Sequence, residues 1–423
     1  MLLRDTKEGK IMNGLILHSD LNCFYASVEM NECPQLRGKK VAVCGSTENR
    51  HGIVLTASYP AKRSGVKTGM ANWEARQNCP DLICVEPHYD LYMKYSGLVR
   101  EIYHRYAEDV EPFGMDECWL SMPYTDDAEG EGKKIADEIR ETVTRETGLT
   151  VSIGVSFTKV FAKLGSDMKK PDAVTVISRE NYRRRVWPLP VSELLYVGRS
   201  TTRQLMLMNI STIGELAGTD PELLRRKLGK NGIMLWRSAA GEDHAPVMPK
   251  GYEIPIKSVG HGSTCVRDLY TEEEVWKVLY ELAQDVARRM RIYGLRARGV
   301  CLWVRDCDLG GRQYQARLSM PTRSSLAIAQ LAFDLFRTRY LWEKPVRALT
   351  VSAINVENAE LPEQTDLFGN WLYREKREKV EMAVDDVRNR FGYGSIRAAS
   401  LQGDLHMASD RCETVEMPSM MYR

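Results

Sequence analysis

The segment Leu15-Ile-Leu-His-Ser-Asp-Leu21 is an apolar run with a carboxylate near its end. A second run, Met115-Asp-Glu-Cys-Trp-Leu-Ser-Met122, carries two adjacent acids. Both runs predict buried strands, because short apolar runs bounded by turn residues are typical of strands inside a sheet. Burying a carboxylate there is costly unless it is paired or binds a metal. Asp20, Asp116 and Glu117 are therefore candidate members of one polar site.

The chemistry of these acids depends on whether they converge. Neighbouring residues of a strand point to opposite faces, so Asp116 and Glu117 can meet only at a bend or a sheet edge. Two or three carboxylates suit Mg²⁺, which prefers oxygen ligands and keeps substrate phosphates in its shell. Two such ions about 3.5–4 Å apart can activate an attacking hydroxyl and stabilise a leaving oxygen. An isolated Asp-Glu pair is also compatible with a solvated strand end, so the pair alone leaves both interpretations open.

The rest of the chain changes character from segment to segment. Strands and helices alternate over roughly the first 180 residues, which predicts an α/β or α+β core. Residues 179–245 indicate short helices broken by glycines, and 248–256, with two prolines, indicate a linker. A further unit is expected at 257–358, built from a helix, two strands, a helix and a strand. A charged helix is expected at about 373–391.

Bulk composition is that of a folded protein with two to four domains, since the chain has 423 residues and 43% hydrophobic content. The net charge of +2 does not identify a nucleic-acid binder. Lys and Arg exceed Asp and Glu by 13 to 7 over 161–230 and by 16 to 12 over 251–358. These excesses are expected where one region binds an anionic partner, but charge alone favours the alternative of a solvated basic face.

The ten cysteines form no C-x-x-C pair and no zinc-like spacing, which indicates a reduced, cytoplasmic protein. The N-terminus has no secretory pattern, and no apolar run approaches the roughly 20 residues that span a bilayer. We therefore expect no membrane partner.

Three segments, in this order, resemble motifs of the Y-family DNA polymerases of the bacterial DinB/UmuC group: 20–29 (DLNCFYASVE), 113–120 (FGMDECWL) and 151–172 (VSIGVSFTKVFAKLGSDMKKPD). The resemblance covers roughly residues 14–358. It implies an α+β multidomain, right-hand polymerase with a palm, small fingers, a helical thumb containing a helix-hairpin-helix, and an α/β little finger. The implied boundaries are palm 14–30 and 89–178, fingers 31–88, thumb 179–247, linker 248–256, little finger 257–358, and C-terminal tail 359–423.

The resemblance assigns the catalytic roles. Asp20 and Asp116 would bind two Mg²⁺ ions, with Mn²⁺ as a substitute. The backbone carbonyl of Leu21 would help to bind one ion, and Glu117 would bind the ion at the primer end.

The resemblance also implies contacts to the incoming deoxynucleoside triphosphate. Tyr25 occupies the position of the steric gate, whose ring would clash with a 2′-hydroxyl. Phe24, Tyr59, Lys62 and Lys170 are the other implied nucleotide contacts. Lys62 departs from the arginine frequent in the family, which weakens a bidentate phosphate contact. Gly114 and Ser121 also depart from the family pattern, but neither stands at a metal-ligand position.

Contacts to primer-template DNA are implied at two places. Residues 192–218 resemble the helix-hairpin-helix, in which amides near Gly198 would bind a phosphate without reading bases. Tyr196 stands where the usual first glycine of that turn is missing, so a plain helical turn remains an alternative. The little finger carries further candidates for the phosphate backbone, namely Arg267, Arg305, Arg312 and Arg317.

A short tail motif, Gln364-Thr-Asp-Leu-Phe368, resembles the peptide that bacterial polymerases insert into the sliding clamp, the beta subunit. Leu367 and Phe368 would fill an apolar pocket, and Gln364 would hydrogen-bond beside it. Clamp binding raises the effective concentration of a weak binder on DNA.

Taken together, the resemblance implies a monomeric, template-directed and error-prone DNA polymerase for lesion bypass in an SOS-type damage response. Two alternatives belong to other classes. One is a non-catalytic scaffold that binds DNA and the clamp, which loss of any of the three carboxylates would favour. The other is a nucleotide cyclase, because palm-like sheets with two acids also serve cyclases.

Overall fold

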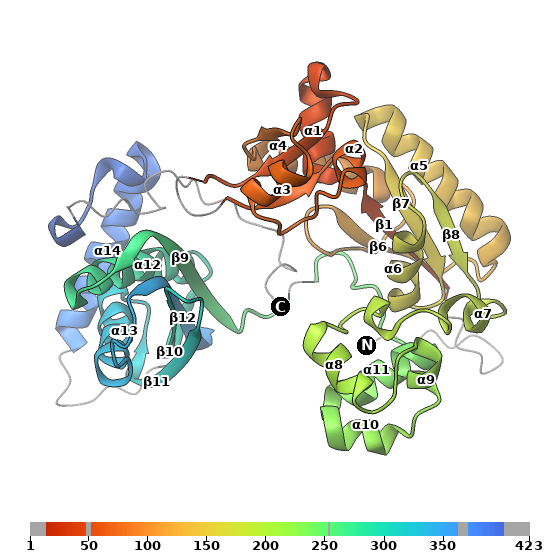
Figure 1. Ribbon diagram of the computed structural model, residues 1–423. Helices are drawn as coiled ribbons and strands as arrows, with labels where there is room; N and C mark the ends of the chain where they lie inside the picture. Colours follow the sequence, from red (N-terminus) through yellow and green to blue (C-terminus); the bar gives the residue numbers. More distant parts are fainter. Residues whose placement is uncertain (1–13, 48–51, 253, 363–370, 402–423) are drawn as a thin grey trace. The chain divides into compact units, whose positions relative to one another are not determined.

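The structure is a computed structural model that describes residues 14–47, 52–252, 254–362 and 371–401. The chain divides into two compact units, and the main division falls between Glu253 and Ile254, inside the expected linker, while the short segment 46–53 is grouped with the second unit (Figure 1). None of the helices in these ranges is long and apolar enough to cross a bilayer.

A five-stranded sheet forms the centre of the first unit, in the order β5-β6-β1-β7-β8. β1 is antiparallel to both of its neighbours, and β7 is parallel to β8. The strands are β1 (Leu15–Leu21), β5 (Val110–Pro112), β6 (Glu117–Met122), β7 (Val151–Ser156) and β8 (Val174–Ile177).

One face of this sheet holds the main core of the first unit. Successive residues of β1 alternate between the two faces, so Leu15 and Leu17 share one face. They pack there with apolar side chains of α4 (Tyr89–Tyr103) and α5 (Lys133–Thr147). The helix α1 (Phe24–Glu32), which follows β1 directly, also contributes to this core.

The other face of the sheet is covered by α6 (Lys159–Met168). Gly154 of β7 permits this close packing, because a Cβ at that position would lie 1.9 Å from the Ala162 carbonyl oxygen. His18 and Asp20 of β1 point to this face and contact side chains of α6. The alternation along β1 therefore sends Leu15 and Leu17 to the core and His18 and Asp20 to α6.

The first unit also contains a small sheet and a helical region. The sheet has the order β3-β2-β4. Its strands and helices are β2 (Val41–Cys44), β3 (Val54–Ala57), β4 (Ile83–Val85), α2 (Tyr59–Arg63) and α3 (Asn72–Asn78). The helical region consists of α7 (Tyr182–Val186), α8 (Arg199–Met206), α9 (Ile213–Ala217), α10 (Pro221–Leu228) and α11 (Lys230–Ala240).

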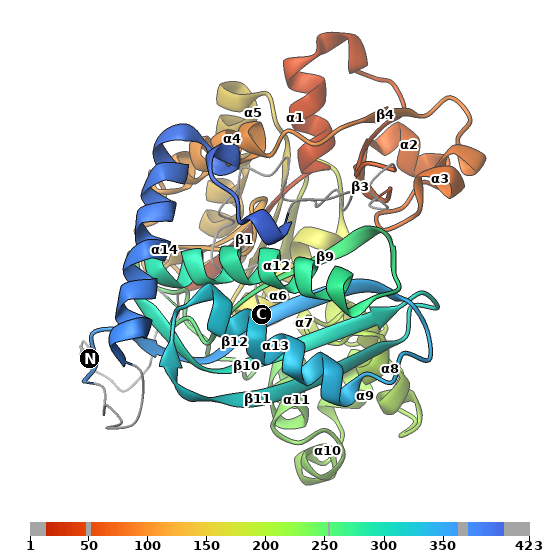
Figure 2. The same ribbon diagram turned by 90° about the vertical axis from the view of Figure 1, so that its left-hand side faces the viewer.

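The second unit is a four-stranded antiparallel sheet in the order β11-β10-β12-β9, with two long helices packed on it (Figure 2). Its elements are β9 (Ser258–Leu269), α12 (Glu272–Ile292), β10 (Leu295–Asp306), β11 (Gly311–Thr322), α13 (Ser325–Arg339) and β12 (Val346–Asn358).

The strand β9 was absent from the expected set of elements. Its sequence is rich in glycine and polar residues, so it lacks the apolar pattern of a strand. Gly260 and Gly262 are required by the pairing with β12. A Cβ at these positions would lie 2.4 Å from Ser352 Oγ and 2.2 Å from Thr350 Oγ1. Cross-strand packing, which the local sequence does not reveal, therefore explains these glycines.

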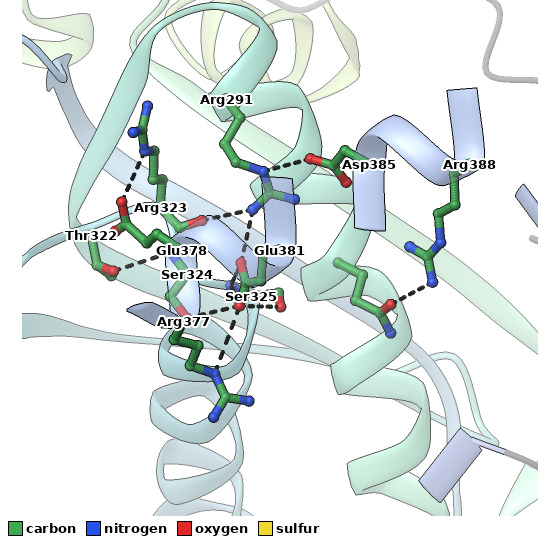
Figure 3. Close-up of polar contacts among 11 residues, drawn as sticks. Arg291, Thr322, Arg323, Ser324, Ser325, Arg377, Glu378, Glu381, Asp385 and Arg388 are labelled. Carbon is green, nitrogen blue, oxygen red and sulfur yellow. Dashed lines mark hydrogen bonds and ion pairs between the residues drawn. The ribbon is translucent and has the colours of Figure 1, made fainter. Parts of the chain in front are cut away.

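The helix α14 (Trp371–Phe391) is part of the second unit. Figure 3 shows polar contacts of its side chains with residues of α12 and α13. Arg291 of α12 forms ion pairs with Glu381 at 2.8 Å and with Asp385 at 2.6 Å. Glu381 also accepts hydrogen bonds from the Ser325 amide and the Ser324 hydroxyl, at the N-terminus of α13. The helix was expected from its composition, but its attachment through these polar contacts was not.

Candidate active site

Asp20 and Glu117 lie opposite each other in the pairing of β1 with β6. Both side chains reach the α6 face, where Lys163 contacts each of them. Asp116 lies in the bend that precedes β6, and its carbonyl oxygen accepts a hydrogen bond from the Leu21 amide at 2.9 Å. The bend required for two adjacent acids to converge is thus present, and a backbone contact to β1 holds it.

Two lysines bring positive charge to these carboxylates. Lys163 Nζ lies 2.7 Å from Glu117 Oε2 and 3.8 Å from Asp20 Oδ2. Lys170 Nζ lies 2.7 Å from Asp20 Oδ2. Asp167 contacts both ammonium groups, at 3.4 Å from Lys163 and 2.8 Å from Lys170. The result is a chain of alternating charges that runs from Glu117 to Asp20.

A buried histidine completes this network. His18 is fully buried, with Nε2 at 3.2 Å from Glu117 Oε2 and Nδ1 at 2.9 Å from Ser166 Oγ. Its ring also lies edge-on to Trp119, with 5.2 Å between the centroids. His18 therefore holds Glu117 from the side opposite to solvent.

The candidate list from the sequence lacked His18, Lys163 and Asp167. Two signals could have found them. His18 is two residues before Asp20, so strand periodicity puts both on one face. Lys163 and Asp167 are four residues apart, so helix periodicity puts them side by side.

Burial and charge set the protonation of the acids. Burial, followed by repulsion from Glu117 and Asp20, raises the pKa of Asp116 to about 7. Burial also raises the pKa of Asp20, although Lys170 opposes this effect. Burial acts in the same direction on Glu117, but the close contact with His18 and the charge of Lys163 outweigh it and lower its pKa to about 2. Asp116 is therefore the acid that is least compensated by positive charge.

The donor chemistry of this site fits a hard divalent cation, since Asp20, Asp116 and Glu117 offer carboxylate oxygens. Asp116 has no ion pair with a lysine or arginine among the residues that the structure describes. Within the same ranges, no three His, Cys, Asp or Glu side chains are already arranged around one metal position. The three carboxylates thus have the ligand type and the negative charge that a divalent cation requires. Lys163 contacts both Asp20 and Glu117, and Lys170 contacts Asp20.

The uncompensated charge of Asp116 predicts a stability effect. A raised pKa means that the folded protein holds this proton more tightly than the unfolded chain, so stability falls as pH rises from about 4 to 7 and then levels off. We expect Asp116→Asn to raise Tm above pH 7 by roughly 3–8 °C, for a gain of about 1–2 kcal/mol. Scanning calorimetry from pH 4 to 8 measures this effect. Asp126→Asn, an exposed acid in the loop after β6, is the control, and an equal gain in both variants would contradict the assignment.

Aromatic side chains line the approach to the carboxylates. The Tyr25 ring stacks on Tyr92 with 4.3 Å between centroids and an interplanar angle of 12°. Burial, and then the charge of Asp116, raises the pKa of the Tyr25 hydroxyl, so it stays protonated. Phe24 is buried behind it and could reach a ligand only through its backbone. Of Phe24 and Tyr25, Tyr25 is therefore the residue whose side chain faces the acids.

The other implied nucleotide contacts come from α2 and from the turn after α6. Tyr59 is the first residue of α2. Burial raises the pKa of its hydroxyl, and the charges of Lys170 and Asp20 also influence this pKa. The exposed Lys62 ammonium lies 5.3 Å from the centre of the Tyr59 ring. The structure thus brings Tyr59 and Lys170 to the acids, with Lys62 one turn further out.

The implied DNA contacts are spread over both units. Gly198 is the N-cap of α8, and the space beside its Cα is open. In the second unit, Arg317 is exposed on β11, and Arg305 lies 4.9 Å from the Trp303 ring. Arg267 and Arg312 pair with Glu274 and Glu343, at 2.5 and 3.4 Å. Two of the four arginines are therefore already paired with acids. The clamp motif Gln364–Phe368 lies outside the described residues.

Solved structures and family models show which class of protein this chain resembles. Among solved structures, a Y-family DNA polymerase chimera matches with a TM-score of 0.71 at 23% identity, covering 81% of this chain and 99% of that chain. The fold is thus the α+β multidomain, right-hand fold of Y-family polymerases. Two models, of the impB/mucB/samB family and of its C-terminal domain, match residues 19–167 and 256–367.

Curated relatives agree with this class. DNA polymerase IV of Acetivibrio thermocellus is 48% identical over 393 residues, which is 93% of this chain and 98% of the relative. DNA polymerase IV 1 of Bacillus subtilis is 38% identical over 389 residues, or 90% and 92% of the two chains. The chain belongs to the impB/mucB/samB family.

Proposed function

We propose that this chain is a DNA-directed DNA polymerase for lesion bypass, which adds deoxynucleotides to a primer 3′-hydroxyl by two-metal nucleotidyl transfer. The observation that carries the proposal is the convergence of Asp20, Asp116 and Glu117 beside two lysines. Family membership supports the polymerase activity, because relatives of nearly full length are named DNA polymerase IV.

In this proposal the carboxylates of Asp20, Asp116 and Glu117, with the Leu21 carbonyl, hold two Mg²⁺ ions. When bound, the ions activate the attacking hydroxyl and stabilise the leaving oxygen. Lys170 exchanges its contact with Asp20 for the triphosphate, which suits a flexible point-charge donor. Lys163 and His18 keep Glu117 oriented. Tyr59 and Lys62 extend the phosphate contacts, and Tyr25 bounds the sugar.

The proposed partners are primer-template DNA and the sliding clamp. The amides near Gly198 and the arginines of the second unit would follow the phosphate backbone, which makes binding salt-sensitive and independent of sequence. We also propose that the protein acts as a cytoplasmic monomer in SOS-type damage tolerance.

The first test is extension of a labelled primer by the purified full-length protein with Mg²⁺ and single deoxynucleotides. Incorporation that follows the template base supports the proposal. Intact DNA binding without extension would favour the scaffold alternative. A parallel reaction with nucleotide and Mg²⁺ but no DNA tests the cyclase alternative, since a cyclic product would contradict polymerase function.

The clamp peptide has its own test. We expect the double substitution Leu367→Ala/Phe368→Ala to leave extension of a short primer unchanged while removing stimulation by the loaded clamp, because these side chains would fill the apolar pocket of the clamp. The measurement is product length on a primed circle with and without clamp and loader. Thr365→Ala, which changes a neighbouring residue outside the apolar pair, is the control. Equal stimulation of the double variant and the wild type would exclude this peptide as the docking site.

A further inference from the structure

The segment after α11 is attached to the edge of the large sheet before it leaves the first unit. Val247 is 6% exposed and packs against Trp119 of β6 and Ala162 of α6. The Met248 amide donates a hydrogen bond to Glu111 Oε2 at 2.8 Å. The Lys250 amide donates to Asp109 Oδ1 at 3.1 Å. The first residues of the linker are thus fixed on β5 and its neighbours.

A buried ion pair supports this attachment. Glu111 is 3% exposed, and its Oε2 lies 2.5 Å from Lys159 Nζ at the start of α6. The same ammonium group lies 4.3 Å from the Trp119 ring, whose Nε1 donates to the Lys159 carbonyl oxygen at 3.0 Å. One carboxylate oxygen therefore joins α6 and the linker backbone. We call Asp109, Glu111, Lys159 and the amides of Met248 and Lys250 the linker clasp.

A buried ion pair is weak evidence for a purely stabilising role, because desolvation offsets most of its attraction. Such a pair is better suited to fixing a position, provided that its remaining hydrogen-bonding capacity is used. Here the linker amide of Met248 uses part of that capacity. The clasp therefore holds a segment in which the described residues between Ala240 and Ser258 form no helix or strand.

The clasp shortens the tether between the two units. Roughly 7 residues separate Lys250 from β9, and a chain of this length spans at most about 25 Å when extended. If the clasp is lost and the adjacent Val247 is released with it, the connecting segment begins after α11, at roughly 17 residues and about 60 Å. Effective concentration falls as about the −3/2 power of tether length, so this lengthening corresponds to about a fourfold loss.

We propose that Glu111 is a positioning residue that fixes the start of the linker and thereby raises the effective concentration of the second unit at DNA held by the first. Only the effect on DNA binding rests on the proposed function. The attachment of the linker itself concerns the protein alone.

The test uses the full chain with two independent variants. Glu111→Ala removes the acceptor. Met248→Pro removes the linker amide and leaves the Glu111–Lys159 pair in place, and Met248→Ala, which removes the side chain but keeps the amide, is its matched control. Glu29→Ala is the control for the cleavage readout alone, because Glu29 is another buried acid of the first unit, at 4% exposed, that contacts His88 and Tyr92 rather than the linker. Circular dichroism and Tm identify a variant that fails to fold.

The first readout is limited trypsin digestion at Lys250 and Lys257, identified by mass spectrometry. Local opening controls such cleavage, and we expect both clasp variants to be cut at least about fivefold faster than the wild type and the control. Unchanged cleavage in folded Met248→Pro would overturn the proposal.

The second readout separates affinity from turnover. We expect the Kd for primer-template DNA to rise about fourfold in both clasp variants, with the incorporation rate at saturating DNA within about twofold of the wild type. Faster cleavage with an unchanged Kd would overturn the positioning role. A wild-type protein that binds no primer-template DNA would contradict the proposed function, while the cleavage rates would still decide whether the clasp holds the linker.

Discussion

Asp116→Ala is expected to abolish primer extension, by at least about 10³-fold, while the Kd for primer-template DNA stays within a few-fold. The large effect follows from removing one of the three carboxylates on which electrostatic catalysis at this site would depend. The small effect on binding follows from the fold. The main-chain hydrogen bond from the Leu21 amide to the Asp116 carbonyl oxygen holds the bend, and it does not depend on the side chain.

The measurement is single-turnover incorporation with Mg²⁺, together with DNA binding by fluorescence anisotropy. Asp126→Ala removes an exposed acid from the same unit and should extend primers normally. Normal extension by Asp116→Ala would overturn the assignment of the site. Loss of both extension and DNA binding in a correctly folded variant would mean that Asp116 also positions the DNA.

The central part of this site could be predicted because it depends on local patterns. The apolar runs around Asp20 and Glu117 specify β1 and β6. The strand period allows Asp116 and Glu117 to converge only at a bend or a sheet edge, and the structure has a bend at Asp116. The resemblance then assigned roles to these acids. The structure adds that Asp20 and Glu117 are paired with lysines, whereas Asp116 has no such ion pair among the described residues and has its pKa raised to about 7.

The parts that could not be predicted depend on contacts between distant segments. Lys163 and His18 matter because α6 packs over β1, and neither residue is unusual within its own segment. The role of Glu111 could not be predicted for the same reason, because its partner in the linker, Met248, is 137 residues away in the chain. In the second unit, Glu381 pairs with Arg291, which is 90 residues away in the chain. In the sequence alone, Glu381 cannot be distinguished from a solvent-exposed acid on a charged helix.

Tyr25→Ala is expected to raise the ratio of ribonucleotide to deoxyribonucleotide incorporation by about 100-fold or more, a range typical of a site that rejects a wrong substrate by close contact. The reason is the rigidity of the ring. Tyr25 stacks on Tyr92, and Tyr89 lies edge-on to both rings at 5.9 and 5.7 Å. Tyr92 is fixed in turn by a hydrogen bond from its hydroxyl to Glu29. A ring held in this way cannot move aside for a 2′-hydroxyl, whereas alanine leaves room for it.

The measurement is the ratio of kcat/KM for matched ribonucleotide and deoxyribonucleotide opposite one template base. Tyr25→Phe is the matched control, because it keeps the ring and its stacking and removes only the hydroxyl. Selectivity that survives in Tyr25→Phe and disappears in Tyr25→Ala would identify the ring itself as the barrier. An unchanged ratio in Tyr25→Ala would exclude Tyr25 as the gate. Loss of selectivity in both variants would instead mean that the hydroxyl, kept protonated by burial and by the charge of Asp116, selects the sugar through a hydrogen bond.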